Sequence, residues 1–281
     1  MSYTKEDIIR IVKEEDIEFI RMQFVDIFGQ LKNVAITASQ IEKAVNNQIT
    51  FDGSSIEGYT RINESDQYLY PDLNSFAIFP WRPAQGKVAR LICDVYNPDG
   101  NPPLWATPAG CSAGCSSAAG TWALMPSTSG RSWSSSSLRL TTRATPPPSP
   151  GTRRATSTWG PLDHGESTRR EICLNLEQMG FEIEASHHEV AQGQHEIDFK
   201  YADALRTADN IMTFKLAVKT LAQKNGLHAT FMPKPIFGIN GSGMHTNMSL
   251  FQGGKNAFYD PDDPKGLSKR HIHSSPVCWP T

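Results

Sequence analysis

A compositional break in the middle of the chain most constrains how these 281 residues can fold. From Gly100 to Leu162 there is no Asp, Glu, Lys, His, Gln, Ile, Val, Phe or Tyr, while Ser, Thr, Pro, Ala, Gly and Arg dominate. Ordering a residue costs about 1–2 kcal/mol, and a segment without Ile, Val or Phe buries too little apolar surface to offset that cost. We therefore expect residues 101–159 to be disordered and to separate two folded parts.

The composition also excludes several classes of function. A formal net charge of −2 gives no electrostatic case for binding nucleic acid or an anionic membrane surface. The first ten residues are too charged for a signal peptide, and no apolar run reaches the length needed to span a membrane. Five cysteines at irregular spacing do not form a disulfide framework. We expect a cytoplasmic protein.

The residues before the break predict a small α+β domain, residues 1–100. Thr4 and Asp7 form a variant of the capping box at the start of a short helix. Four segments rich in β-forming residues predict strands: 19–28, 31–37, 76–79 and 88–95. The first two meet at Gly29, which indicates a hairpin.

The residues after the break continue the α+β pattern. Residues 166–179 predict a helix that ends at Gly180, and residues 202–224 predict a longer helix that ends at Asn225-Gly226. Three further segments predict strands: 181–190, 195–199 and 227–232.

Two stretches carry most of the functional information. Residues 184–199, EASHHEVAQGQHEIDF, set Glu189 and Glu196 on either side of a turn that contains glycine. Residues 231–249, FMPKPIFGINGSGMHTNMS, lead through a glycine-rich loop to His245. Taken singly, a glutamate on a strand is usually solvated and a lone histidine is usually structural. Together, hard oxygen ligands and one imidazole suit Mg²⁺ or Mn²⁺.

With FDGSSIEG at residues 51–58, these stretches resemble type I glutamine synthetase, over about residues 2–100 and 160–269. The resemblance implies a small β-grasp-like N-terminal domain and a catalytic domain built on an antiparallel sheet with helices. It implies ATP-dependent ligation of glutamate and ammonium through γ-glutamyl phosphate, in a homo-oligomeric ring. Mg²⁺ or Mn²⁺ would neutralise the approaching phosphate and carboxylate charges.

The resemblance assigns metal-binding roles to three residues. Glu189 and Glu196 would bind the metal nearer glutamate, and His245 the metal nearer the nucleotide phosphates. Asp52 matches the residue that binds ammonium and takes its proton, for which a carboxylate is suited. Considered alone, Asp52-Gly53 is an ordinary β-turn sequence.

The resemblance also assigns substrate contacts in the second stretch. Asn240 and Gly241 would contact glutamate, because a glycine-rich turn lets backbone groups approach a small ligand. Asn247 and Ser249 would lie toward the nucleotide. Some family members have His where Asn247 stands, so a stacking role for this side chain on adenine is not assigned.

The break itself admits three interpretations. A disordered linker explains its proline content but not its four tryptophans. Cys111 and Cys115 resemble half a metal site, yet no histidine is near them. The third interpretation is a shifted reading frame. Trp has a single codon, TGG, so the bases at Trp133 are known and can be read in another frame. A one-base shift over residues 129–136 can then yield Gly-Pro-Glu-Leu-Glu-Phe-Phe, the form of a metal-binding motif of the family. The same shift makes residues 270–281 apolar.

We therefore expect residues 160–269 to be a partial catalytic domain and residues 270–281 an out-of-frame tail. As written, the chain lacks both glutamates of that motif and the later segments of the family. We expect it to be inactive in ligation. Two alternatives are a non-catalytic relative that binds partners or co-assembles with intact subunits, and a ligase for another amine. The intact loop at Asp52 argues against the latter.

Overall fold

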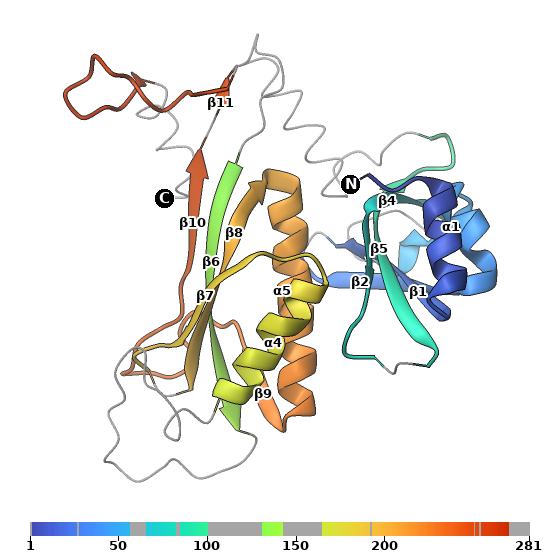
Figure 1. The fold of residues 1–281 in the computed structure, drawn as a ribbon, viewed down its shortest axis with the longest axis horizontal. Coiled ribbons are helices and arrows are strands. Elements are labelled where there is room, and N and C mark those ends of the chain that lie inside the picture. The colour runs from blue at the N-terminus through green and yellow to red at the C-terminus, as the bar shows by residue number, and fades with distance from the viewer. Residues whose placement is uncertain are drawn as a thin grey trace. The chain divides into compact units, whose positions relative to one another are not determined.

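The computed structural model describes residues 2–26, 28–56, 66–82, 85–100, 131–142, 165–191, 193–249, 251–252 and 254–269 (Figure 1). Contacts divide the chain into two compact units, Met1–Leu124 and Met125–Thr281. The division falls within the segment 101–159 that was expected to separate two folded parts. Within the described ranges, no helix is long and apolar enough to cross a membrane.

The N-terminal unit is a five-stranded mixed sheet with the order β2-β1-β5-β4-β3. Strands β1 and β5 run parallel, whereas the other neighbours are antiparallel. The two helices place buried apolar residues in one core with the strands. The elements are α1 (Lys5–Glu14), β1 (Ile17–Val25), β2 (Leu31–Thr37), α2 (Ile41–Val45), β3 (Ile49–Asp52), β4 (Asp66–Ile78) and β5 (Lys87–Tyr96).

The β1–β2 hairpin is closed by a buried carboxylate. Asp26 is 4 % exposed, and its Oδ1 accepts hydrogen bonds from the backbone N–H groups of Phe28 (2.9 Å) and Gln30 (2.8 Å). Nζ of Lys32 lies 3.3 Å from the other oxygen. Burial alone would raise the pKa of Asp26, but the hydrogen bonds from Gln30, Lys32 and Phe28 bring it below its ordinary value. Gly29 has a φ of +71°, which favours glycine.

The C-terminal unit is an antiparallel sheet with the order β10-β6-β8-β7, in which β9 also pairs with β6. Helices α4 and α5 cover one face of this sheet (Figure 1). The elements are β6 (Arg131–Thr142), α4 (Glu166–Gln178), β7 (Ile183–His188), β8 (Gln194–Asp203), α5 (Ala204–Lys224), β9 (Leu227–Thr230) and β10 (Met244–Ser249). A short hairpin of β11 (Phe251–Gln252) and β12 (Lys255–Asn256) follows.

Side chains of β8 point alternately to the two faces of the sheet, which places apolar residues in the core and carboxylates on the opposite face. Ile197 and Phe199 are buried, and the ring of Phe199 packs 5.7 Å from that of Phe214 on α5. Because successive side chains of a strand point to opposite faces, Glu196 and Asp198 lie on the face away from the helices. These two carboxylates are only partly buried.

Strand β6 corrects the expectation of disorder. Arg131–Thr142 lies inside the segment 101–159, yet it forms a strand between β10 and β8. Ladder hydrogen bonds use backbone groups, and the neighbouring strands present unpaired N–H and C=O groups to any chain that fits between them. Tertiary pairing therefore overrides the poor apolar content here. Residues 101–130, 143–159 and 270–281 lie outside the described residues.

Candidate metal site

Three side chains converge on the open face of the C-terminal sheet. His187, Glu189 and Glu196 each offer a ligand atom within 4.8 Å of the others, the sole such group that the described residues contain. Nε2 of His187 lies 2.9 Å from Oε1 of Glu189 and 3.6 Å from Oε2 of Glu196. His187 and Glu196 are directly opposed between β7 and β8, and Glu189 follows His187 by two residues. Strand periodicity thus puts all three on one face.

The donor set fits a hard divalent cation. Ligands at right angles around Mg²⁺, at about 2.1 Å each, lie about 3 Å apart, close to the spacings within this cluster. Burial alone would raise the pKa of Glu189, but hydrogen bonds with Glu196, His187 and the Val190 N–H bring it below its ordinary value. This carboxylate is therefore ionised near neutral pH, as a metal ligand must be.

A further carboxylate lies on the same face as the cluster. Asp198 follows Glu196 by two residues in β8, and its Oδ1 is buried without a hydrogen-bond partner among the described residues. Burial raises the pKa of Asp198. An orphaned buried carboxylate oxygen is costly, and a bound cation is one way to satisfy it.

A tight turn fixes Glu189. Its N–H donates to the carbonyl oxygen of Gln194 (2.8 Å), and the Gln194 N–H donates to that of Ala191 (3.0 Å). The Val190 N–H donates to Oε2 of Glu189 itself (3.0 Å). Gly193 has a φ of +67°, which favours glycine in this turn.

The glycine-rich loop contacts the same turn. The side-chain amide of Gln194, which is 3 % exposed, donates to the carbonyl oxygen of Gly241 (2.8 Å) and to Oγ of Ser242 (3.3 Å). A Cβ at Gly241 would lie 2.5 Å from the carbonyl oxygen of Pro233, so a larger residue does not fit. Asn240 and Gly241, the predicted glutamate contacts, are exposed.

A buried polar layer lies behind the cluster. Nη1 of Arg169 on α4 donates to Nδ1 of His195 (2.7 Å), which must accept because guanidinium nitrogens only donate. His195 is therefore neutral, with its proton on Nε2. Its ring meets that of His188 edge to face at 5.1 Å, and Nδ1 of His188 donates to the carbonyl oxygen of Glu189. The layer ties helix α4 to the Glu189 backbone.

The three predicted residues of β10 are described through their backbone alone. His245 pairs with Ser135 of β6, which pairs with Asp198 of β8, so the three stand in one cross-strand row. Two strand spacings separate the ends of that row by about 10 Å. Asn247 and Ser249 follow along β10, two and four residues further.

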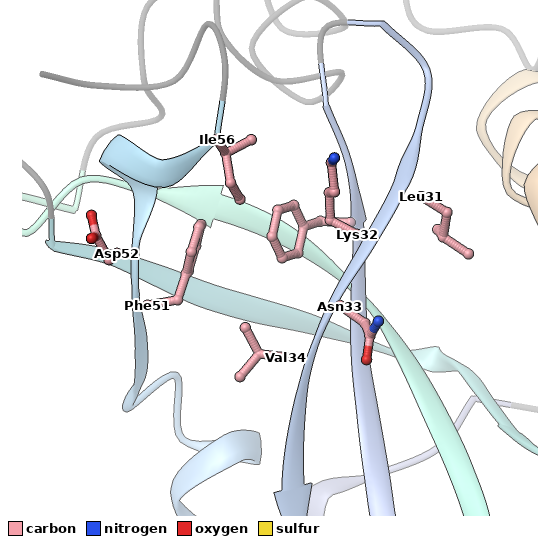
Figure 2. Close-up of a pocket in the computed structure, with 8 residues that line it drawn as sticks. Leu31, Lys32, Asn33, Val34, Phe51, Asp52 and Ile56 are labelled. Atoms are coloured by element: carbon pink, nitrogen blue, oxygen red, sulfur yellow. The ribbon is translucent and has the colours of Figure 1, made fainter.

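Asp52 belongs to the N-terminal unit. Its carboxylate is exposed, and Oδ1 accepts from the N–H (2.9 Å) and Oγ (2.6 Å) of Ser54, capping the short 3₁₀ turn Gly53–Ser55. Figure 2 shows it at the edge of an open groove of about 400 Å³. The other lining residues are Phe24, Leu31, Lys32, Asn33, Val34, Phe51 and Ile56.

Sequence reasoning missed His187. Its spacing of two residues from Glu189 was a usable signal, because such residues share a face of a strand. The missing information was the register that sets His187 opposite Glu196. Gln194, Arg169 and His195 carried no signal of their own, since their partners are distant in sequence.

Comparison with known proteins identifies two matching families. "Glutamine synthetase, beta-Grasp domain" matches residues 16–98, and "Glutamine synthetase, catalytic domain" matches residues 127–274. The glutamine synthetase of Clostridium saccharobutylicum is 58% identical over 271 residues, covering 95% of this chain and 60% of the relative. That of Staphylococcus aureus strain Mu50 is 51% identical over 268 residues, with the same coverages. The chain thus spans about 60% of the length of these relatives.

Solved structures agree on the fold. The GmaS/ADP complex superposes with a TM-score of 0.80 at 29% identity, covering 93% of this chain and 60% of that one. Plasmodium falciparum glutamine synthetase superposes with a TM-score of 0.84 at 21% identity, covering 97% and 59%. At that identity the second likeness supports the fold alone.

Proposed function

Because this chain belongs to the glutamine synthetase family, we propose that its C-terminal unit binds Mg²⁺ or Mn²⁺ through Glu189 and Glu196. His187 is the third donor within reach. The observation that carries this proposal is the convergence of the three side chains on one face of the sheet. When bound, the ion would supply positive charge for the phosphate and carboxylate groups of a glutamate–ammonia ligase.

The remaining substrate contacts follow the family assignment. Glutamate would lie against the loop at Asn240 and Gly241, both of which are exposed. ATP would lie toward Asn247 and Ser249 on β10, and His245 would face its phosphates. The structural relative GmaS has been solved with ADP, which supports a nucleotide site in this fold. Asp52 would bind ammonium, in the neighbouring subunit's site of a ring oligomer.

We further infer that the chain as written does not complete ligation. Strand β6, RSWSSSSLRLTT, contains no carboxylate, although its register sets Ser137 opposite Glu196 and Ser135 opposite Asp198. Phosphoryl transfer between two anions needs dense positive charge, and each missing metal ligand weakens the binding of the ion that supplies it. The shifted frame of residues 129–136 would return two glutamates to this part of the sheet.

Metal binding tests the first part of the proposal. In Mn²⁺ titrations of the full chain, Glu189→Gln and Glu196→Gln should each weaken binding at least tenfold, or about 1.4 kcal/mol. Glu184→Gln is the matched control, because Glu184 lies on β7, near the cluster in sequence, but is exposed. A chain that binds no Mn²⁺, or a control that weakens binding as much as the two variants, would refute the proposed site.

Activity tests the second part. The purified chain should form no γ-glutamyl hydroxamate from glutamate, hydroxylamine and Mg-ATP. A gene with the shifted frame restored over codons 103–160 and after 269 should encode a chain that assembles into rings and makes glutamine. Hydroxamate formation by the chain as written would overturn the inference of inactivity. A stop codon in the shifted frame within codons 104–159 would overturn the frameshift interpretation.

A further inference from the structure

One buried side chain joins the metal-binding turn to the glycine-rich loop. Gln194 is 3 % exposed, and its Nε2 donates to the carbonyl oxygen of Gly241 (2.8 Å) and to Oγ of Ser242 (3.3 Å). Its Oε1 accepts from the N–H of Ala191 within the turn (3.3 Å). The amide thus makes one hydrogen bond inside the turn and two to a segment 47 and 48 residues away.

The backbone of the same residue contacts the ligand-bearing positions. The carbonyl oxygen of Gln194 accepts from the N–H of Glu189 (2.8 Å), and Glu196 follows two residues later on the same face of β8. A cation that fixes both carboxylates would therefore restrain Gln194 from two sides. The loop, in contrast, is exposed at Asn240 and Gly241, and exposed loop segments open locally at a low free-energy cost.

We propose that Gln194 is a positioning residue that transmits occupancy of the metal site to the glycine-rich loop. The inference rests on the proposed metal site and adds that occupancy of this site is coupled to the order of the glycine-rich loop. An ion held by Glu189 and Glu196 orders the turn, and the Gln194 amide extends that order to Gly241 and Ser242. Glutamate would then meet a loop that no longer has to be ordered, so the two ligands bind cooperatively.

Substitutions can separate the hydrogen bond that the Gln194 side chain accepts within the turn from the two that it donates to the loop. Glutamine supplies an acceptor and two donors, and the contacts to Ala191, Gly241 and Ser242 use both kinds. Gln194→Glu keeps the acceptor for the Ala191 N–H but loses both donors to the loop. Gln194→Met keeps a similar volume and loses all three hydrogen bonds.

Amide hydrogen exchange of the full chain, with and without saturating Mg²⁺, reads out the coupling. The reporter in the loop is the N–H of Ser242, which donates to the carbonyl oxygen of Pro233 (2.8 Å). In the wild type, Mg²⁺ should slow exchange at least threefold in peptides covering residues 189–194 and also in those covering residues 240–243. In Gln194→Glu the first effect should remain and the second should disappear.

Two further variants complete the experiment. Gln194→Met should also lose the effect of Mg²⁺ on the loop. Gln223→Glu is the matched control, because it makes the same chemical change at an exposed position in the last turn of α5. It should retain both effects of Mg²⁺.

The outcomes distinguish this inference from the metal site itself. Absence of any Mg²⁺ effect in the wild type would mean that the proposed metal site is wrong. Protection confined to residues 189–194 in the wild type would overturn the coupling and leave the metal site standing. Loop protection that persists in both Gln194 variants would also overturn it. Loss of cooperative thermal unfolding in both variants would assign Gln194 a purely structural role and refute the proposal.

Discussion

Gly165→Ala tests the buried polar layer behind the cluster. Gly165 precedes α4 and is buried, and an added Cβ would lie against Nε2 of His195 and 2.5 Å from its Cε1. The φ of Gly165 is −98°, which alanine also adopts, so the substitution adds no backbone strain. The expected cost is therefore steric. His195 is 1 % exposed, and its Nδ1 is held by Arg169, so the ring has little room to move.

The magnitude follows from how the ring can respond. If it stays, overpacking costs about 1–3 kcal/mol. If it moves, the hydrogen bond from the charged Arg169 breaks, which costs about 1.5–3 kcal/mol. The two responses together predict a loss of about 1–3 kcal/mol in the free energy of unfolding of the C-terminal unit. Urea denaturation followed by circular dichroism should show a lower midpoint with an unchanged slope.

A double-mutant cycle decides whether the clash is the cause. In a His195→Ala background the added methyl meets no ring, so Gly165→Ala should cost less than about 0.5 kcal/mol there. The coupling free energy between the two positions should then be about 2 kcal/mol. If Gly165→Ala costs the same in both backgrounds, the reasoning from the His195 ring is wrong.

Two more predictions concern the stability of the N-terminal and C-terminal units. Asp26→Ala should destabilise the N-terminal unit by about 2 kcal/mol at pH 7, since the N–H groups of Phe28 and Gln30 lose their acceptor. The folded-state pKa of Asp26 lies below that of the unfolded chain, so its contribution is complete above about pH 3.9 and disappears as the pH falls further. The denaturant midpoints of the wild type and of Asp26→Ala should therefore converge as the pH falls from 7 to 2. A difference between the two that stays constant over this range would contradict the role assigned to the Asp26 carboxylate. Phe214→Ala, at a ring 1 % exposed, should cost about 3–5 kcal/mol, whereas Leu205→Ala on the same helix, 62 % exposed, should change stability by less than about 0.5 kcal/mol. Equal midpoints for those two variants would refute the assigned core.

Short sequence motifs correctly predicted the features that depend on residues close together in the chain. The capping box at Thr4 and Asp7, the β1–β2 hairpin at Gly29 and the end of α5 before Gly226 are all present. Strand β4 was predicted only at its end, because Pro71 interrupts the β pattern. That proline is accommodated where β4 pairs with β5, next to a register irregularity between Asp72 and Ala77.

The candidate site divides in the same way. Glu189 and Glu196 were predicted from the resemblance of residues 184–199 to the family motif, and the structure places them close together. His187 needed the β7–β8 register, and the contacts of Gln194 and Arg169 join segments that are far apart in the chain. Strand β6 needed three neighbouring strands to form, which no sequence window contains.

The placement of β6 makes the sheet a ready scaffold for ligand engineering. Ser137 stands directly opposite Glu196 in the register, so Ser137→Glu would add a carboxylate to the row that already contains His187. Without a cation, two like charges opposed across a strand pair repel each other. With a cation at the proposed site, both would become ligands, and the free energy of metal binding would be added to that of folding. Under the proposed metal site, this single substitution would make the melting temperature depend more steeply on the concentration of free Mg²⁺ than it does in the wild type.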